Sequence, residues 1–407
     1  MNVDTPVVVA YRGGNAALAA ARTLGRMGVR VYYAGKRTGI GIEDSRYWSD
    51  CFWWDFDAPR EKTLQFFIQV AQTVGKRPIL LGVTDWTAMF VDEYADRLKE
   101  YYVFPKAAPG ALETLVSKWG MCDAANKLGV PTPRTWLPRT RQDVLDFIET
   151  ALFPVVVKAA DPSAPRPPAK GIAADARELL AMFDAIGSDD PNVVFQEFIP
   201  GGADAVWMCN AYLDETAHCR AAYTGRKLRQ VDDTGIASLA VTESNPTVAD
   251  QTRRLLEGTG YRGLAGIGYK YDPRDGRYKL LDVNARLSGV FRLFRAVDGM
   301  DVVRLCYLDL TGQPLPESTV LPGRKWMLEA DVFAGLRAMR EKKITFWQWL
   351  KSMQGVRETH WFALDDPRPG FAWFQAEVAP RLSLSRLWRR KPRPVRREVA
   401  FRKPEKT

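Results

Sequence analysis

The strongest constraint on the fold lies in residues 7–34, where a strand, a helix and a second strand follow one another. The run VVVAY predicts a buried strand, the glycine turn after it leads into a helix from Asn15 to Met27, and VRVYYA predicts the second strand. Two strands joined by a crossover helix form a parallel pair that the helix covers. The chain is therefore predicted to begin as an α/β fold.

The turn after the first strand leaves a dinucleotide site open as an alternative. The N-terminus of a helix can receive an anion. Gly13 and Gly14 do not complete the spacing G-x-G-x-x-G, and Lys36 and Arg37 stand where a ribose-binding acid is expected. An NADP-dependent oxidoreductase that uses these four residues is kept as an alternative function.

Composition argues against several other classes of function. The net charge of the 407 residues is +10, but nearly all of the excess lies in residues 381–407, so a nucleic-acid-binding protein is not expected. Two histidines, His218 and His360, argue against a multi-His metal site or a His-dependent hydrolase. The five cysteines form no C-x-x-C pair and no apolar run is long enough to span a membrane, so a cytoplasmic location is expected.

The middle of the chain predicts a different, α+β arrangement. A helix that starts near Ser117 ends at Gly129, FPVVVKAA (153–160) predicts a strand, and VVFQEFIPGG (193–202) predicts another. The runs LAGIGYKY and RYKLLDVN flank a DPRDG turn, so they predict a β-hairpin. A second part of the chain, built on antiparallel strands, is expected here.

The hairpin leads into KLLDVNARLSG (279–289), which carries an unusual set of polar residues. Asp282, Asn284 and Arg286 stand at alternate positions, so in a strand they share one face. A strand with one solvated face gives the same alternation. Asp and Asn are poor strand formers, however, and their oxygens are ligands that Mg²⁺ takes beside nucleotide phosphates. The pattern predicts either a half-solvated strand or a metal-binding one.

The order of these motifs resembles the ATP-grasp superfamily. The matching parts are a lysine at a helix start, VVVK, a Pro-rich loop, QEFIPGG, and acid-x-Asn-x-Arg after a hairpin, within roughly residues 5–310. RGLAGIGYKYDPRDGRYKLLDVNARLSGVFRLF and DLTGQPLP most resemble carboxylate-amine ligases of the D-aspartate ligase type. The resemblance implies a Rossmann-like N-terminal domain followed by a two-lobed ATP-grasp fold. It also implies that a substrate carboxylate attacks the γ-phosphate of ATP and that an amine takes the resulting acyl phosphate.

The same resemblance implies ATP and Mg²⁺ as cofactors, and small-molecule carboxylates and amines as partners. The nucleotide-binding residues would be Lys118 and Lys158 at the phosphates, Glu197, Phe198 and Ile199 at the adenine, and Asp204 at the ribose. Asp282 and Asn284 would hold the metal, while Arg286 would stabilise charge on the transferred phosphoryl group. Such transfer needs cations and a metal rather than a histidine base.

A second cationic pair lies in GRKLRQ. Lys227 and Arg229 are two residues apart, so they are predicted to share a strand face. They form either a solvated cationic strand or a clamp on the phosphates or the substrate carboxylate, since Arg suits bidentate binding of carboxylates. With Arg286 they are the candidate catalytic residues.

One position departs from the pattern that the resemblance implies. The family usually has an acidic metal ligand on the first strand of the hairpin, where this chain has Gly268. Asp272 or water would have to take its place. A nucleotide-binding protein with weak or no ligase activity is therefore kept as an alternative function.

Four regions are expected along the chain. They are an N-terminal α/β domain in residues 1–110, the two ATP-grasp lobes in 111–320, a C-terminal helical extension in 321–380 and a basic tail in 381–407. Prolines and dense positive charge predict a solvated, disordered tail. The alternative is that the tail binds an anionic membrane surface, because basic residues near such a surface each add to affinity. The oligomeric state is left open.

Overall fold

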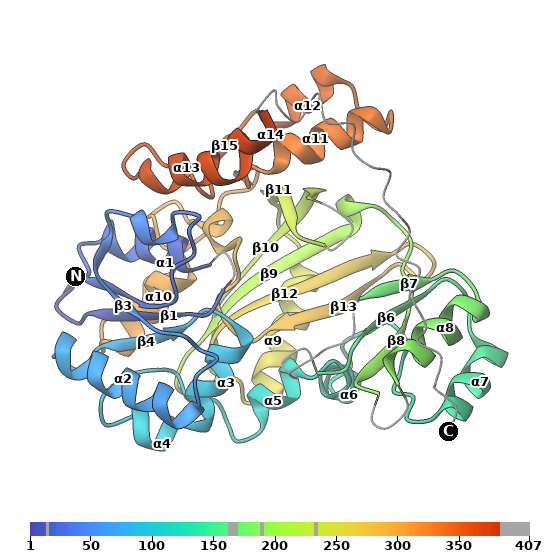
Figure 1. The fold of residues 1–407 in the computed structure, drawn as a ribbon, viewed down its shortest axis with the longest axis horizontal. Helices are drawn as coiled ribbons and strands as arrows, with labels where there is room; N and C mark the ends of the chain where they lie inside the picture. The colour runs from blue at the N-terminus through green and yellow to red at the C-terminus, as the bar shows by residue number, and fades with distance from the viewer. Residues whose placement is uncertain (14–15, 162–169, 188–190, 232–234, 383–407) are drawn as a thin grey trace, which may run out of the picture.

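The computed structural model describes residues 1–13, 16–161, 170–187, 191–231 and 235–382. Within them the strands form three sheets, of four, four and seven strands. Figure 1 shows the three sheets arranged around a central space, with a layer of C-terminal helices above them. The predicted combination of an α/β part and an α+β part is confirmed.

The N-terminal sheet is parallel and has the strand order β3-β2-β1-β4. Its strands are β1 (Val7–Tyr11), β2 (Val31–Gly35), β3 (Trp48–Trp53) and β4 (Ile79–Gly82). One face packs against α1 (Ala16–Gly25), and the other packs against α2 (Arg60–Val74), α3 (Asp85–Glu93) and α4 (Ala95–Leu98). The predicted parallel pair formed by β1 and β2 is confirmed, whereas Asn15, the predicted start of the helix between them, lies outside the described residues.

The helical segment that follows β4 is divided into two helices, α3 and α4. Thr84 caps α3 because its hydroxyl accepts the amide of Thr87 at 3.2 Å, and the Thr87 hydroxyl accepts the Thr84 amide at 3.0 Å. This reciprocal capping sets the start of the helix at Asp85. At Tyr94 the backbone leaves the helical conformation, so α4 follows as a separate turn.

The second sheet has the order β5-β8-β6-β7 and its pairs are antiparallel. Its elements are β5 (Thr135–Trp136), α7 (Arg141–Thr150), β6 (Val155–Ala159), β7 (Gly171–Ala173), α8 (Ala176–Ile186) and β8 (Val193–Glu197). Helices α7 and α8 bury one face of this sheet. Two helices precede the sheet, α5 (Ala111–Val116) and α6 (Lys118–Lys127). This unit is called the small lobe below.

The third sheet is the largest, with the order β13-β12-β9-β10-β11-β14-β15. Its strands are β9 (Val206–Leu213), β10 (Cys219–Gln230), β11 (Ala237–Thr242), β12 (Gly263–Asp272), β13 (Arg277–Asn284), β14 (Lys325–Met327) and β15 (Val356–Thr359). The helices are α9 (Pro246–Gly258), α10 (Val302–Leu310), α11 (Asp331–Arg340), α12 (Phe346–Ser352), α13 (Arg368–Trp373) and α14 (Ala379–Leu382). Short helical turns are η1 (Ile42–Asp44), η2 (Ala203–Ala205), η3 (Phe291–Phe294) and η4 (Phe374–Val378).

The C-terminal extension is not purely helical, which corrects the prediction for residues 321–380. Strand β14 pairs antiparallel with β11, and β15 pairs parallel with β14. Both strands are too short for a periodic pattern to mark them in the sequence. Through them the extension is continuous with the large sheet rather than appended to it.

The large sheet buries its two faces unequally. Apolar side chains of β9, β12 and β13 pack against α5, α6 and α9 on one face. On the other face, β9 and β10 pack against α1 and α10 of a core shared with the N-terminal sheet. Alternating positions on β12 and β13 of that second face are glycine or polar, namely Gly266, Gly268, Asp282 and Asn284. This polar stretch is the floor of the candidate site.

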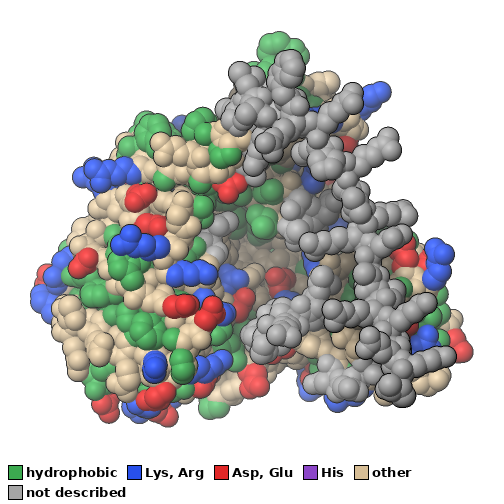
Figure 2. All heavy atoms as spheres, viewed as in Figure 1, with side chains coloured by type: hydrophobic (Ala, Val, Ile, Leu, Met, Phe, Trp, Pro, Cys, Tyr) green, Lys and Arg blue, Asp and Glu red, His purple; other side chains and the backbone are tan. Residues whose placement is uncertain are grey.

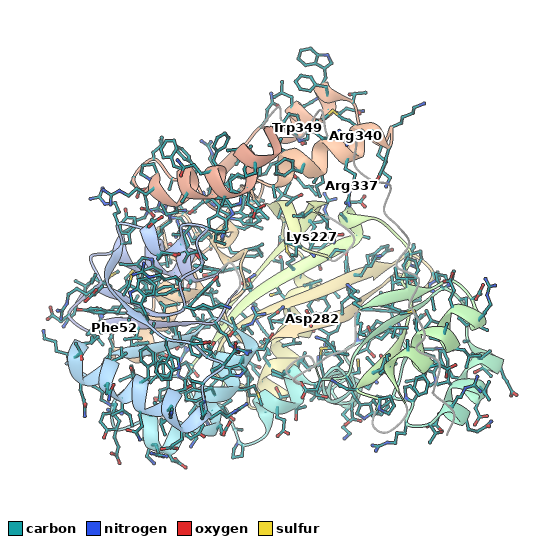
Figure 3. The ribbon with its side chains drawn as sticks, viewed as in Figure 1. Phe52, Lys227, Asp282, Arg337, Arg340 and Trp349 are labelled. Carbon is teal, nitrogen blue, oxygen red and sulfur yellow. The ribbon has the colours of Figure 1, made fainter. Side chains whose placement is uncertain are left out.

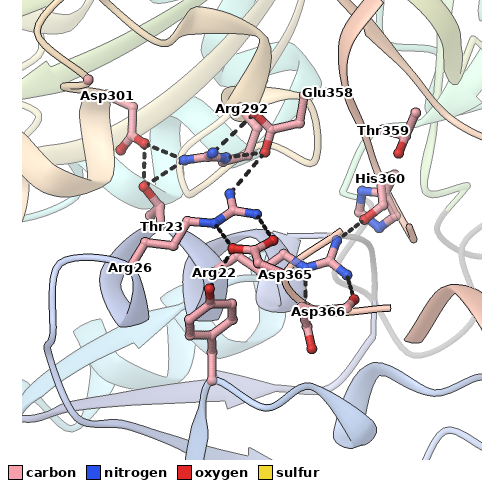
Figure 4. A network of polar contacts seen from close by, with 12 residues as sticks. Arg22, Thr23, Arg26, Arg292, Asp301, Glu358, Thr359, His360, Asp365 and Asp366 are labelled. Carbon is pink, nitrogen blue, oxygen red and sulfur yellow. Dashed lines mark hydrogen bonds and ion pairs between the residues drawn. The ribbon is translucent and has the colours of Figure 1, made fainter. Parts of the chain in front are cut away.

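A buried network of ion pairs joins the N-terminal sheet to the C-terminal extension (Figure 4). Arg22 of α1 is 2% exposed and donates from Nε to Asp366 Oδ2 at 2.9 Å. It also donates to the backbone carbonyls of His360 and Trp361, each at 2.7 Å. Because all three partners follow β14, the first helix of the chain is fixed by its C-terminal region.

The same network extends to η3 and α10. Arg292 donates to both carboxylate oxygens of Glu358, at 2.7 and 3.0 Å, and to Asp301 at 3.1 Å. Arg26 donates to both oxygens of Asp365 at 2.8 Å. We call the following set the arginine network: Arg22, Arg26, Arg292, Arg304 and Arg324 with Asp301, Glu358, Asp365 and Asp366.

Candidate functional site

Side chains from three different elements meet at Asp282 on β13. The Nζ of Lys118, the first residue of α6, donates to Asp282 Oδ1. The charge of Asp282 also acts on Lys158 of β6 and Lys227 of β10. Figure 3 places Lys227 and Asp282 on the large sheet, where Figure 2 shows a central hollow in this face of the molecule. The site therefore lies between the small lobe and the large sheet.

Local structure brings the two lysines of the small lobe together. Ser117 caps α6 by accepting the Gly120 amide at 3.2 Å, which fixes Lys118 at the helix start. The Lys118 amide donates to the Ala160 carbonyl at 2.8 Å, so the start of α6 lies beside the end of β6. Lys158 stands near that end, and its Nζ donates to Gln196 Oε1 at 2.7 Å.

Burial and mutual repulsion lower the pKa values of two of these lysines. Burial lowers the pKa of Lys158 to about 8; Asp282 opposes this effect, while Lys118 and Lys170 add to it. Burial also lowers the pKa of Lys227 to about 8, again with Lys170 as a neighbouring charge. Lys118, Lys158 and Lys227 thus bring three ammonium groups towards one carboxylate, and the charge of Lys170 acts on two of them. We call Lys118, Lys158, Lys170 and Lys227 the lysine cluster.

The carboxylate at the centre of the cluster is held in its charged form. Burial would raise the pKa of Asp282, but Lys118, Lys158 and Arg286 outweigh that effect and lower it. The side chain of Asp282 is 45% exposed, against 13% for that of Lys118. Asp282 therefore presents negative charge to the hollow at neutral pH.

Asn284 and Arg286 continue the polar face beyond Asp282. Asn284 Nδ2 donates to the Gly266 carbonyl at 3.2 Å, and its Oδ1 accepts Arg286 Nη2 at 3.0 Å. The strand itself ends at Asn284, earlier than the sequence suggested. Arg286 is held there by Asp85 at the start of α3, with Nε to Oδ1 at 2.9 Å. A helix that packs on the N-terminal sheet, α3, thus supplies the residue that orients Arg286.

The predicted alternation along KLLDVNARLSG holds only in its second half. Val283 and Ala285 are buried on the opposite face, but a bulge falls between the pairs Gly268 with Asp282 and Tyr269 with Leu280. Leu281 is the extra residue at this bulge, and its side chain is only partly buried. The bulge resets the phase of the strand just before the polar stretch.

Gly268 lies directly opposite Asp282 in the register of the hairpin. A Cβ atom built on Gly268 would meet no atom nearer than Asp282 Cβ, at 4.0 Å. The backbone therefore leaves space for a side chain here. The sequence departure at Gly268 coincides with an open position beside the candidate metal ligand.

The prediction that Lys227 and Arg229 share a strand face is wrong. Leu228 is bulged out of register between them, since Lys227 pairs with Ala240 and Arg229 with Leu239. Arg229 turns to Asp331 instead, with Nε to Oδ1 and Nη2 to Oδ2 both at 2.8 Å. Arg229 therefore joins β10 to α11, and of the two residues only Lys227 belongs to the lysine cluster.

The residues expected at the adenine lie in and after β8. Glu197 already accepts Arg274 at 2.7 Å and the Arg134 amide at 3.2 Å. The Lys270 ammonium donates to the Ile199 carbonyl at 2.8 Å and lies 5.4 Å from the centre of the Phe198 ring. The last of the set, Asp204, is exposed in η2. These residues form a group separate from the contacts of Asp282.

The residues behind the dinucleotide alternative do not converge in the described structure. The Arg37 guanidinium stacks on Trp53, 4.5 Å from the ring centre, and Lys36 is exposed. Gly14 lies outside the described residues.

The side chains at Asp282 fit one magnesium ion that is also bound by phosphates. Among the described residues, no three His, Cys, Asp or Glu side chains are grouped closely enough to hold a metal by themselves. Magnesium usually takes only one or two carboxylates and completes its shell with water and nucleotide phosphates. Asp282 with the amide oxygen of Asn284 meets that need, and the lysine cluster fits the phosphates.

Comparison with known proteins decides the fold. No protein-family model matches the chain. The chain is 27% identical to D-aspartate ligase of Enterococcus faecium (strain Aus0004) over 262 residues, 60% of this chain and 61% of that protein. N5-carboxyaminoimidazole synthetase from Staphylococcus aureus superposes with a TM-score of 0.63 at 13% identity, covering 84% of this chain and 87% of that one. For L-amino acid ligase from Bacillus licheniformis the TM-score is 0.59 at 14% identity, covering 80% and 79%.

The chain has the ATP-grasp fold. The resemblance seen in the motifs of the sequence is confirmed by the relative and by the solved structures. In this ATP-grasp fold the lysine cluster lies where the small lobe faces the large sheet. The chain spans only about 61% of the curated relative, so the activity of that relative is not transferred with the fold.

Three site residues were missed by the sequence reasoning. Lys170 follows the Pro-rich loop, and only the structure shows that its charge reaches Lys158 and Lys227. Gln196, beside Glu197 in the QEFIP motif, is 1% exposed and accepts Lys158. Asp85 carried no signal, because its partner Arg286 lies 201 residues away.

Proposed function

We propose that this protein is an ATP-dependent carboxylate-amine ligase that works through an acyl-phosphate intermediate. The lysine cluster around Asp282 supports this proposal most directly. Several cations crowded beside one carboxylate, with pKa values depressed by burial and mutual repulsion, favour the binding of a polyanion. The triphosphate of ATP supplies that charge, and the ATP-grasp fold is consistent with it.

The proposed division of labour follows from charge and position. Lys118, Lys158 and Lys227 would neutralise phosphate oxygens, and Asp282 with Asn284 would hold Mg²⁺. Mg²⁺ held there would supply positive charge to offset the charge of the phosphate oxygens. Arg286, positioned by Asp85, would face the charge that develops on the transferred phosphoryl group. Arg229 is left out of this set because Asp331 already binds it at both nitrogens.

The reaction needs no ionisable base on the protein in its first half. The carboxylate substrate attacks the γ-phosphorus of ATP, ADP leaves, and an acyl phosphate forms. An amine then attacks the acyl carbon, inorganic phosphate leaves, and an amide results. The name of the curated relative makes D-aspartate the first carboxylate to test. Formation of ADP that requires both a carboxylate and an amine would support the proposal.

The exchange Asp282→Asn tests the proposed metal ligand. We expect turnover to fall by at least about a hundredfold, since an anionic ligand of the metal is lost, while the half-exposed site leaves folding unchanged. The matched control is Asp250→Asn, an exposed acid on α9 that pairs with Arg254 of the same helix. Wild-type turnover of Asp282→Asn at saturating Mg²⁺ would contradict the assignment.

The alternative is an ATP-binding protein without ligase chemistry, and Gly268 favours it. A missing acidic ligand opposite Asp282 would weaken metal binding. This alternative predicts nucleotide binding with no ADP release in any combination of carboxylate and amine. The ligase proposal fails if that result holds for a broad set of amino acids.

We further propose that the protein acts in the cytoplasm and reaches the inner membrane surface through its basic tail. Among the described residues no helix has the length and apolarity to cross a membrane, and residues 383–407 lie outside them. The cysteines are free thiols, as suits a reducing compartment. Sedimentation with anionic vesicles should fall with salt and should fall again on truncation after Leu382. Equal sedimentation of full-length and truncated protein would remove the tail from the proposal.

A further inference from the structure

The layer above the large sheet ends in a hairpin of two helices, α11 and α12. One side of this hairpin is fixed to the sheet, since Asp331 accepts Arg229 and also accepts Trp349 Nε1 at 3.3 Å. A Cβ atom on Gly335 would come within 2.3 Å of Trp349 Nε1, so the indole of α12 packs directly on α11. Trp349 therefore lies on the face of α12 that packs against α11 (Figure 3).

With Trp349 turned inwards, the large apolar residues of α12 face outwards. Trp347 is 73% exposed, Phe346 52% and Leu350 43%. On α11, Val332 and Leu336 are one turn apart and are exposed as well. A soluble surface seldom exposes so many large apolar side chains on one short hairpin without a binding role.

Positive charge surrounds these apolar residues. Lys342 and Lys343 occupy the turn before α12, Lys351 lies in the last turn of α12, and Arg340 ends α11; all four are exposed. Acidic residues offset these charges only in part: Glu341 pairs with Lys343, and Asp331, the second acid in residues 331–352, is buried. The outer side of the hairpin therefore combines aromatic side chains with net positive charge.

We propose that the α11–α12 hairpin docks on an anionic lipid bilayer. Trp347, Phe346 and Leu350 enter the interface between headgroups and acyl chains, where aromatic residues are favoured. The lysines of the turn contact the phosphates of the headgroups. This surface is separate from the ligase site and does not depend on the proposed reaction.

Charge argues for lipid over a second copy of the chain. In a two-fold dimer the same patch would meet itself, so Lys342 and Lys343 would oppose their own copies. A bilayer rich in anionic lipid has the complementary sign. The chain also continues from α14 into residues 383–407, which carry further excess positive charge. A second basic segment would thus leave from the same C-terminal extension.

Flotation with lipid vesicles tests the hairpin directly. The full chain is mixed with vesicles of phosphatidylcholine and phosphatidylglycerol, or of phosphatidylcholine alone. We expect binding to the mixed vesicles only, weakened by high salt. The double exchange Phe346→Ser with Trp347→Ser should lower the affinity about tenfold, since two interfacial aromatic side chains are lost. Lys342→Glu with Lys343→Glu should lower it comparably.

The control is Leu152→Ser, which removes an apolar side chain that is 73% exposed in the small lobe. It should bind vesicles as the wild type does. A protein truncated after Leu382 separates the contributions of the two basic segments. If the truncated protein still binds vesicles, and if the exchanges in the hairpin abolish that binding, the result supports docking through the hairpin. Loss of all binding on truncation, with the hairpin variants unaffected, overturns it. A hairpin variant that binds vesicles as the wild type does, but has a different sedimenting mass in lipid-free solution, also overturns the proposal. The patch would then join copies of the chain.

Discussion

Two groups of cations in this protein differ in how their positive charge is paired. In the arginine network every guanidinium meets a carboxylate or a backbone carbonyl, as Arg22 does with Asp366. In the lysine cluster, Lys118 pairs with the carboxylate of Asp282, whereas Lys158 and Lys227 donate to uncharged oxygens, of the Gln196 amide and the Gly235 carbonyl. The arginine network joins parts of the fold through ion pairs. In the lysine cluster the cations outnumber the carboxylate beside them, which is typical of sites that bind anions, and this is why the cluster is the part of the molecule proposed to bind phosphate.

The largest expected effect comes from breaking an ion pair in the arginine network. Arg22→Ala leaves Asp366 buried without its guanidinium, which should cost about 3–5 kcal/mol of the free energy of unfolding. Urea denaturation measures this loss. Arg12→Ala, which breaks an exposed pair with Asp57, should cost no more than about 1 kcal/mol. Equal stability of both variants would show that the arginine network does not hold the fold.

Removing a lysine of the lysine cluster should lower the affinity for ATP rather than the stability of the fold. Lys158→Ala removes a charged contact and should weaken ATP binding by about 1.5–3 kcal/mol, roughly ten- to a hundredfold in Kd. Calorimetry gives the affinity, and Lys127→Ala, an exposed lysine on α6, is the control. If ATP bound the folded Lys158 variant unchanged, the lysine cluster would not be the phosphate site.

The depressed lysine pKa values predict a dependence of ATP affinity on pH. Lys158 and Lys227 titrate at about 8 in the free protein. Only their charged forms attract phosphate, so affinity is full below that pH and falls above it. Between about pH 7 and pH 9 each lysine should cost about tenfold in Kd. Lys158→Met should remove half of this dependence, and a flat profile in the wild type would contradict the assigned burial.

The smallest expected effect is a gain of metal affinity, produced by adding an acid beside the lysine cluster. Gly268→Glu places a second carboxylate opposite Asp282, where the structure has room for it. The Mg²⁺ concentration needed for half-maximal nucleotide binding should fall severalfold. Gly266→Glu is the contrast, since a Cβ there would lie 2.4 Å from Ser288 Cβ and should disturb the sheet. An unchanged Mg²⁺ requirement in Gly268→Glu would place the metal elsewhere.

Much of the fold could be predicted because its signals are local. The parallel unit of β1 and β2 and the hairpin of β12 and β13 followed from periodicity and turn residues, and both are confirmed. The order of motifs also predicted that Lys118, Lys158 and Asp282 would converge, and the structure groups them. Their roles in binding ATP and metal remain predictions.

The features that the sequence did not reveal depend on contacts between distant segments. The bulge at Leu228 sends Lys227 and Arg229 to different partners, and no residue type marks it in advance. Arg22 and Asp366 are 344 residues apart, so neither carries a local signal of the other. Asp85 is similarly hidden, because an acid that follows a capping threonine is ordinary for the start of a helix.

The pairing of Arg22 with Asp366 also sets an order of events during synthesis on the ribosome. Helix α1 leaves the ribosome first, yet the residues that neutralise its buried guanidinium are 344 positions later. At about 5–20 residues per second that delay is roughly 20 to 70 s. During this interval the guanidinium of Arg22 on α1 lacks the carboxylate and the carbonyls that bind it in the finished fold. The face of α1 that carries Arg22 is therefore expected to stay in contact with water until residues 360–366, which follow β15, have left the ribosome.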